Sequence, residues 1–310
     1  MTAPVVLVTS RSFSSGSRDL IGELTAAGAD VIHGPVDHDL PTLSNVLRRT
    51  TAWIAGAGPV TRSHIAAAPN LRIIARYGVG VDAVDLDAAA DLGVVVTNTP
   101  GANTDAVADH AMALTLALLR HIVPANRDAR AQHWRPRLAR EVASLHIGVV
   151  GFGHIGRSFS ARMLALGSTV SAYDPLLTAR DLAAAGVKLA ALAGLSSCDV
   201  VSLHAPGGRV LIDADWLADV KPGLLLVNTA RASLVDEAAI ADALRRGALG
   251  GYAADDLGPD PTDGTHPVLA DDLADIVVVT PHCAAQTEEA VDTMSTSVTR
   301  AVLAVLEAPA

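Results

Sequence analysis

The chain has 310 residues, of which half are hydrophobic and 18% are charged, and its formal net charge is −10 at pH 7. This length is typical of about two ordinary domains. The acidic balance, without a run of Lys or Arg, argues against a nucleic-acid partner. The apolar stretches are far shorter than the roughly 20 residues of a membrane span. With no apparent signal peptide and no metal-ligand spacing around Cys198 and Cys283, we expect a soluble cytoplasmic protein without a metal site.

Short runs rich in Val and Ile alternate with stretches rich in Ala and Leu along the chain. Such alternation predicts βα units and a mostly parallel sheet. We expect strands at residues 5–8, 53–55, 72–75, 94–97, 146–150, 169–173, 200–204, 224–228 and 276–280. We expect helices at residues 20–27, 158–166, 237–246 and 287–306.

Residues 104–119 differ from this pattern because they are apolar nearly all round, which predicts a buried helix. The polar segment that follows, residues 120–140, is rich in Arg and contains Trp134. It is either an arm that reaches over a partner subunit or a solvated helix.

The strongest local motif is the Gly-x-Gly-x-x-Gly turn at residues 151–156, which follows one predicted strand and opens a helix. In such a turn Gly151 permits the tight bend, Gly153 lets the backbone approach a pyrophosphate, and Gly156 lets the helix pack on the strand. The next predicted strand ends at Asp174, where a carboxylate would bind the ribose hydroxyls and repel a 2′-phosphate. This pairing predicts NAD; the alternative is a Gly turn with an incidental Asp.

Four polar residues near predicted strand ends are candidates for chemistry at the nicotinamide: Arg231, Asp255, Asp260 and His282. Reduction of a 2-oxo acid requires a cation for the carboxylate, a proton donor for the new hydroxyl and a carboxylate that tunes the donor. Open α/β sheets bind ligands at the carboxyl ends of their strands. Each residue also has an ordinary explanation, such as an ion pair for Arg231 or turn formation for Asp260.

Several motifs follow one another in a particular order. They are Arg-Tyr-Gly-Val-Gly-Val-Asp at 76–82, Asn-Thr-Pro-Gly at 98–101, the turn at 151–156, Asn-Thr-Ala-Arg at 228–231 and Thr-Pro-His at 280–282. This set resembles the D-isomer-specific 2-hydroxyacid dehydrogenases, especially the short relatives of phosphoglycerate dehydrogenase. The resemblance implies a Rossmann-type doubly wound parallel sheet, residues 100–281, inserted into a smaller flavodoxin-like α/β substrate domain formed by residues 1–99 plus 282–310. It also implies a homodimer.

The resemblance further implies roles for individual residues. Arg231 would bind the substrate carboxylate, His282 would be the acid/base residue, and Asp260 stands where the family usually has a glutamate. The residues expected to bind NAD are Gly151, Gly153, His154, Ile155, Gly156, Asp174, His204, Pro206, Thr229, Ala230, Asp255 and Ala284. Those expected to bind substrate are Arg76, Gly78, Val79, Gly80, Arg231 and His282.

The sequence also departs from the family pattern. Asp260 has one methylene less than the usual glutamate, which shortens its reach toward His282. Ala232 replaces a usual glycine, Asp109 replaces a usual glutamate, and the stretch after Pro206 is shorter than usual. No reacting group is missing, and the departures together indicate a divergent substrate specialist.

The expected function is therefore an NAD(H)-dependent oxidoreductase that interconverts a small anionic 2-oxo acid and a D-2-hydroxy acid. Two alternatives stay open. One is a related dehydrogenase of the formate or phosphite type, and the other is a non-catalytic, NAD-sensing protein of the corepressor kind.

Arg76 bears on the choice of substrate because the phosphoglycerate enzymes resembled here place an arginine near the substrate phosphate at that position. Arg135 and Arg137 flank the place where those enzymes supply another from the neighbouring subunit. The position of a third family arginine is Ala55 in this chain. A phosphate or phosphonate on the substrate is one interpretation; an ion pair of Arg76 with a nearby acidic residue, Asp82 or Asp105, is the other.

Overall fold

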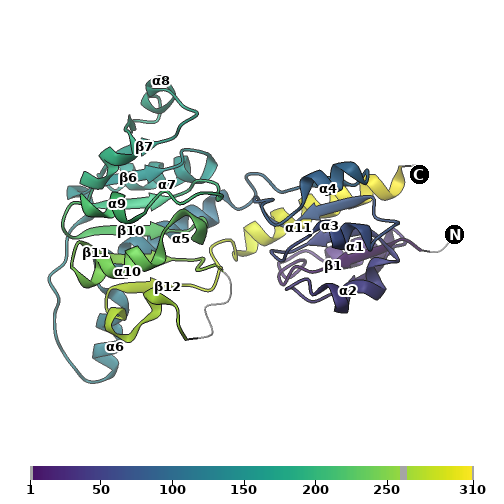
Figure 1. The fold of residues 1–310 in the computed structure, drawn as a ribbon, viewed down its shortest axis with the longest axis horizontal. Coiled ribbons are helices and arrows are strands. Elements are labelled where there is room, and N and C mark those ends of the chain that lie inside the picture. Colours follow the sequence, from purple (N-terminus) through teal and green to yellow (C-terminus); the bar gives the residue numbers. More distant parts are fainter. Residues whose placement is uncertain (1–2, 259–263, 309–310) are drawn as a thin grey trace. The chain divides into compact units, whose positions relative to one another are not determined.

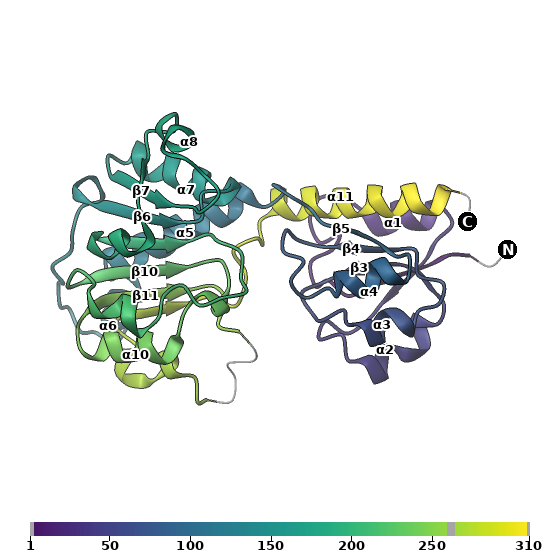
Figure 2. The same ribbon diagram turned by 45° about the horizontal axis from the view of Figure 1, so that its top comes forward.

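Two parallel β-sheets, each flanked by helices, form the computed structural model of the chain, in which residues 3–258 and 264–308 are described (Figures 1 and 2). The chain divides into a smaller unit, drawn from residues 1–103 and 285–310, and a larger unit of residues 104–284. The expected α/β class is confirmed. The boundaries between the units follow residues 103 and 284, a few residues later than the boundaries expected after residues 99 and 281.

The smaller unit contains a parallel sheet in the strand order β2-β1-β3-β4-β5. This order is that of flavodoxin-like sheets, as expected. The strands are β1 (Val5–Val8), β2 (Asp30–His33), β3 (Thr50–Ala55), β4 (Ile73–Arg76) and β5 (Val95–Thr97). The helices are α1 (Leu20–Ala26), α2 (Leu40–Leu47), α3 (Arg62–Ala66), α4 (Leu86–Asp91) and α11 (Glu288–Glu307).

Helix α11 comes from the far end of the chain and packs beside α1 and against β3 and β4 (Figures 1 and 2). The hydroxyl of Tyr77, which follows β4, lies 3.2 Å from the Ser295 hydroxyl of α11. On a second face of the sheet, Trp53 and Ile74 share a buried cluster with Leu43 of α2 and other apolar residues. The smaller unit is therefore complete only when both ends of the chain contribute to it.

The larger unit contains a parallel sheet in the strand order β12-β11-β10-β9-β6-β7-β8. Its strands are β6 (His146–Val150), β7 (Thr169–Tyr173), β8 (Lys188–Leu189), β9 (Val200–Leu203), β10 (Leu224–Asn228), β11 (Leu249–Ala254) and β12 (Val277–Val279). Its α-helices are α5 (Thr104–Leu119), α6 (Ile122–Arg130), α7 (His154–Ala165), α8 (Ala179–Ala183), α9 (Ala214–Ala218) and α10 (Glu237–Arg245). Short 3-10 helices include η1 (Val142–Ser144), η2 (Leu192–Ser197), η3 (Ala232–Leu234), η5 (Pro267–Leu269) and η6 (Asp271–Leu273).

Consecutive strand residues supply two separate cores because their side chains point to opposite faces of a sheet. On β10, Leu226 belongs to the cluster that includes residues of α9 and α10. The next residue, Val227, belongs to the cluster that includes residues of α5 and α7. The buried helix expected at 104–119 is confirmed, since α5 packs on α7 and across β10 to β12.

The strand order of the larger sheet reverses between β6 and β9, which are neighbours in space but not in sequence. In doubly wound sheets, ligands bind at such a switch point, outside the carboxyl ends of the strands. The Gly-rich turn after β6 lies at this point. The loops that follow β6, β9, β10, β11 and β12 are therefore the candidate ligand-binding region.

Some elements differ from the expectations. The edge strands β2 and β8 were not predicted, and β8 has only two residues, both exposed. Helix α7 begins at His154, within the glycine motif and directly after Gly153, and not at Ser158. The segment expected to be an arm or a solvated helix contains α6, followed by irregular, almost entirely exposed residues from 131 to 140.

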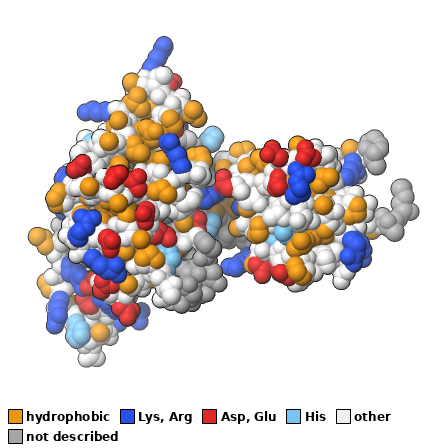
Figure 3. Space-filling model, in the orientation of Figure 1, with side chains coloured by type: hydrophobic (Ala, Val, Ile, Leu, Met, Phe, Trp, Pro, Cys, Tyr) orange, Lys and Arg blue, Asp and Glu red, His pale blue; other side chains and the backbone are white. Residues whose placement is uncertain are grey.

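No single helix in the described chain is long and apolar enough to cross a membrane; α5 and α6 meet the requirement only as a pair bent by 59°. On the face drawn in Figure 3, acidic and basic side chains are interspersed over the larger unit.

Candidate active site

Three glycines shape the turn from β6 into α7. Gly151 has a φ of +89°, and a Cβ there would lie 2.7 Å from the backbone of His204, which follows the neighbouring strand β9. A Cβ at Gly156 would lie 2.1 Å from the carbonyl oxygen of Gly151, whereas a Cβ at Gly153 would meet nothing within 4 Å. The first and third glycines are thus required by packing, and the second faces open space at the N-terminus of α7. An approaching pyrophosphate needs that arrangement.

Asp174 lies directly after β7 and is bound to the glycine turn. Its carboxylate accepts the backbone N–H of Phe152 at 2.9 Å and that of Leu176 at 2.9 Å. These bonds fix a half-buried carboxylate beside the turn, at the place where the sequence predicted a ribose-binding group.

Two buried polar atoms near the switch point have no hydrogen-bond partner among the described residues: Nδ1 of His204 and Oγ1 of Thr229. Burial lowers the pKa of His204 to about 3, so its ring is neutral at pH 7. Its Nε2 lies 3.0 Å from the Ser202 hydroxyl, and its ring lies 5.1 Å from that of Phe159, centroid to centroid. Unpaired buried groups need an explanation, and a bound dinucleotide would supply partners. The residues present therefore fit this cofactor.

Asn228 holds the turn that presents Arg231. Its fully buried side chain accepts the Ala230 N–H at 3.0 Å and donates to the Arg231 carbonyl at 2.8 Å. The Arg231 guanidinium also donates to the Ala230 carbonyl at 2.8 Å. The sequence motif contained Asn228, but its function as the support of this turn was not predicted.

Behind this turn lies a cavity of about 400 Å³, lined by Arg231, Glu237 and Asp256 among others. Glu237 is bound to His266, with 2.7 Å between Oε2 and Nε2, and the second oxygen of Glu237 is buried without a hydrogen-bond partner in the described chain. Burial raises the pKa of Glu237, and the charge of His266 opposes this effect. Both signs of charge therefore line the cavity.

Asp255, which follows β11, holds the segment that carries His282. Its carboxylate accepts the Thr280 hydroxyl at 2.5 Å, the Cys283 N–H at 2.9 Å and the Ala284 N–H at 2.8 Å. Its carbonyl oxygen accepts the His282 N–H at 2.8 Å. Only 3% of the surface of Asp255 is exposed. Its hydrogen bonds therefore go mainly to this segment and not to solvent.

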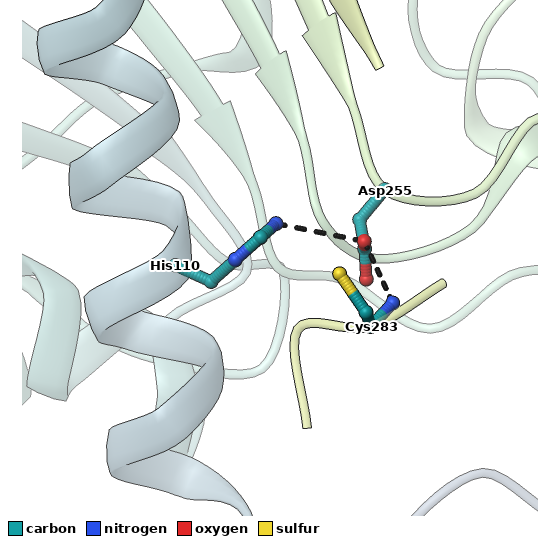
Figure 4. Close-up of side chains that lie close together, drawn as sticks. All are labelled: His110, Asp255 and Cys283. Carbon is teal, nitrogen blue, oxygen red and sulfur yellow. Dashed lines mark hydrogen bonds and ion pairs between the residues drawn. The ribbon is translucent and has the colours of Figure 1, made fainter. Parts of the chain in front are cut away.

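Figure 4 shows the His110 ring extending from α5 toward Asp255 and Cys283. Within the described ranges these three side chains could hold a metal ion by type, with ligand atoms within 4.8 Å of one another. His110 already lies 2.8 Å from the Thr280 hydroxyl, and Asp255 already accepts three hydrogen bonds. Burial, reinforced by the charge of Asp255, raises the pKa of the Cys283 thiol and keeps it protonated. We therefore interpret the cluster as a hydrogen-bonded network.

His282 has a left-handed backbone, with φ of +54°, which is uncommon for a residue other than glycine. Its side chain is 59% exposed, and Nδ1 lies 3.9 Å from a carboxylate oxygen of Asp256. The other oxygen of Asp256 accepts the Ala232 N–H at 3.4 Å. The His282 segment and the turn that carries Arg231 thus meet at one carboxylate, which the sequence interpretation did not single out.

The predicted substrate loop lies in the smaller unit and is described there by itself. Gly78 has a φ of +138°, and its carbonyl accepts the Thr99 N–H at 3.0 Å. The Val79 carbonyl accepts the Asn98 side chain at 2.7 Å. Arg76 folds back on this loop and donates to the Tyr77 carbonyl. The Asn-Thr-Pro-Gly motif therefore braces the loop.

The remaining predicted site residues are placed as follows. His154 and Ile155 form the first turn of α7, Ala230 lies beside Arg231, and Pro206 and Gly80 lie in loops. Asp260 lies outside the described residues, so its predicted role as partner of His282 stays a prediction.

Comparison with known proteins gives one consistent result. Residues 112–284 match the profile of the D-isomer specific 2-hydroxyacid dehydrogenase NAD binding domain. The chain is 38% identical over 309 residues to D-3-phosphoglycerate dehydrogenase of Mycobacterium leprae. This alignment covers 97% of this chain and 57% of the relative. It is 37% identical to hydroxypyruvate reductase of Thermotoga maritima, over 76% of this chain and 78% of that protein.

Among solved structures, D-lactate dehydrogenase from Aquifex aeolicus, complexed with NAD and lactic acid, superposes with a TM-score of 0.85. It shares 25% sequence identity over 98% of this chain and 95% of its own. The chain spans about half the length of the curated phosphoglycerate dehydrogenases it matches, between 44% and 57% of each.

Proposed function

Because this chain belongs to the D-isomer specific 2-hydroxyacid dehydrogenases and carries their NAD-binding domain, we propose that it interconverts a 2-oxo acid and a D-2-hydroxy acid with NAD(H). The observation that carries the proposal is the meeting of the Arg231 turn and the His282 segment at Asp256. The Arg231 turn follows β10 and the His282 segment follows β12, and both strands belong to the sheet that carries the glycine turn. Related enzymes named for phosphoglycerate, hydroxypyruvate and lactate support it.

In the proposed reaction, bound NADH supplies the hydride that reduces C2 of the substrate. Arg231 binds the substrate carboxylate and polarises the neighbouring carbonyl, since a guanidinium matches a carboxylate in two parallel hydrogen bonds. Protonated His282 donates its proton to the developing hydroxyl oxygen, and in the oxidative direction the neutral ring accepts it. The backbone amides of Gly78, Val79 and Gly80, in the smaller unit, are proposed to bind substrate as well.

The cofactor residues act by position. The N–H groups at the start of α7 face the open space above Gly153, where a pyrophosphate would bind. Asp174 is proposed to bind the ribose hydroxyls and to exclude a 2′-phosphate. Asp255 and Ala284 are proposed to lie beside the nicotinamide, with Asp255 acting mainly through the loop it holds.

A substrate with a second anionic group is a further proposal, based on Arg76 beside the carboxylate loop and on the relatives named for phosphoglycerate. We also propose a homodimer in a cytoplasmic location. Exposed apolar side chains of the segment after α6, Trp134 at 87% and Leu138 at 97%, support an arm that packs on a partner.

The test measures NADH oxidation with phosphohydroxypyruvate, phosphonopyruvate, hydroxypyruvate, glyoxylate and pyruvate. We expect turnover with at least one acid, and its loss in His282→Ala with NADH binding retained. NADH binding without turnover on any acid would favour an NAD-sensing protein. Reduction of NAD+ with formate or phosphite, without turnover of any of these 2-oxo acids, would favour the related dehydrogenases.

A further inference from the structure

Two adjacent carboxylates follow β11, and they serve different purposes. The first, Asp255, is almost completely buried and binds the backbone of residues 283 and 284. The second, Asp256, is 21% exposed at its side chain and faces the His282 imidazole. Successive side chains of an extended backbone point in opposite directions. Asp255 can therefore bind the backbone of the His282 loop while Asp256 lies beside the His282 side chain.

The Asp256 carboxylate is held in place before any ligand binds. One oxygen accepts the Gly258 N–H at 3.1 Å, and the same oxygen lies 3.9 Å from Nδ1 of His282. The second oxygen accepts the Ala232 N–H at 3.4 Å. Because these two backbone N–H groups already fix the carboxylate, placing its charge beside the imidazole costs no further side-chain entropy.

The His282 backbone is fixed as well. Its N–H donates to the carbonyl oxygens of Asp255 and Thr280, and its φ is +54°. The fold therefore fixes the backbone of His282 and the carboxylate of Asp256, so that the imidazole starts from a position 3.9 Å from this carboxylate.

We propose that Asp256 is a positioning residue for His282, whose carboxylate orients the imidazole by attracting Nδ1, leaving Nε2 to donate the proton to substrate. This inference rests on the proposed function, in which His282 is the acid/base residue. It assigns a carboxylate in addition to the one expected at position 260.

The other charged groups near Asp256 and His282 have partners or positions of their own. Asp255 directs its oxygens to the loop backbone and to Thr280, and His110 of α5 lies beyond it. Arg231 and Glu237 line the same cavity as Asp256, and Glu237 is bound to His266. Of the described acidic groups, Asp256 is the one whose carboxylate lies within 4 Å of the His282 ring nitrogen, at 3.9 Å.

The experiment compares Asp256→Asn, Asp256→Glu and His282→Ala with a control, Asp215→Asn, which changes an exposed aspartate of α9 in the same unit. For each variant, kcat and KM for reduction of a 2-oxo acid are measured separately, together with NADH binding. We expect Asp256→Asn to lower kcat about tenfold while KM and NADH affinity stay nearly unchanged, because the imidazole is no longer held in the orientation that proton transfer needs. Asp256→Glu should recover much of the lost kcat.

A second measurement does not depend on a substrate. The ring nitrogen resonances of the histidines are recorded by NMR at alkaline pH, with His282 assigned by its absence in His282→Ala. The proton of the neutral His282 ring should lie mainly on Nδ1 in Asp215→Asn and shift toward Nε2 in Asp256→Asn, and the same tautomer in both variants would overturn the inference. Turnover that survives in His282→Ala would refute the proposed function instead, so the two failures are distinguishable.

Discussion

The backbone N–H of His282 donates to the carbonyl oxygen of Asp255 at 2.8 Å, while the carboxylate of the same Asp255 binds the next two amides. The proposed proton donor therefore depends on a buried residue at the end of β11, and its left-handed backbone is stabilised by bonds on both sides of it.

Replacement of Asp255 by Asn should loosen this loop. The N–H groups of Cys283 and Ala284 bind different oxygens of Asp255. The amide oxygen of Asn can accept only one of them, the amide nitrogen then faces the other, and a buried donor facing another donor costs about 1–3 kcal/mol. We expect faster hydrogen exchange of these two amides and a fall in kcat of about a hundredfold, a loss typical of displaced catalytic groups. Asp271→Asn, at an exposed site, is the control; unchanged exchange would mean that the loop is held by other contacts.

The glycine turn allows two effects to be separated. In Gly156→Ala the new Cβ meets the Gly151 carbonyl at 2.1 Å, so the variant should unfold at a lower temperature. In Gly153→Ala the Cβ meets nothing within 4 Å, so the melting temperature should hold while the Kd for NADH rises at least tenfold. Calorimetry and fluorescence titration measure the two quantities. Equal NADH affinity in Gly153→Ala and the native chain would contradict the proposed pyrophosphate position.

Asn228→Ala should weaken the support of Arg231. The variant loses both hydrogen bonds that hold the turn, and the buried partners lose about 1–3 kcal/mol of stabilisation. Because Arg231 is proposed to bind the substrate carboxylate, KM for the 2-oxo acid should rise while NADH affinity is nearly unchanged. Steady-state kinetics and NADH titration would show this; an equal loss of both affinities would indicate a general disturbance of the sheet edge.

Asp199 should make the larger unit sensitive to acid. Its burial raises the carboxyl pKa, but bonds from the His146 N–H, Lys221 and Arg140 outweigh this and lower it to about 2. A depressed folded-state pKa gives stabilisation that is complete above the unfolded value of about 4 and lost as the pH falls toward 2, worth about 2 kcal/mol. Asp199→Asn should remove this dependence and lower stability at pH 7. Urea unfolding at pH 7 and pH 3, with Asp215→Asn as control, measures it.

Much of the architecture could be predicted from sequence because buried parallel strands are continuous apolar runs. The core strands β6, β7, β9 and β10 show this pattern. Edge strands such as β8 lack it, since their side chains are exposed. Short helices were also missed, although α2, α4 and α9 each begin after an aspartate whose side chain caps the helix, a local signal that can be read.

The site shows the same division. Gly151, Arg231 and His282 stand in motifs, so their positions relative to the strands followed from the sequence. Asp256 could not be singled out, because its proximity to His282 depends on the path of two loops that follow different strands. Nor could the support of Arg231 by Asn228, which is a contact between side chain and backbone within one turn.

The return of α11 to the smaller unit has a consequence for biosynthesis. A ribosome releases the chain from its N-terminus, and domains generally fold as units during synthesis. Residues 104–284 can bury both of their cores before α11 is made, whereas β3 and β4 must wait for it. The nascent larger unit can therefore acquire its native packing before the smaller unit does, although the strands of the smaller unit are synthesised before it.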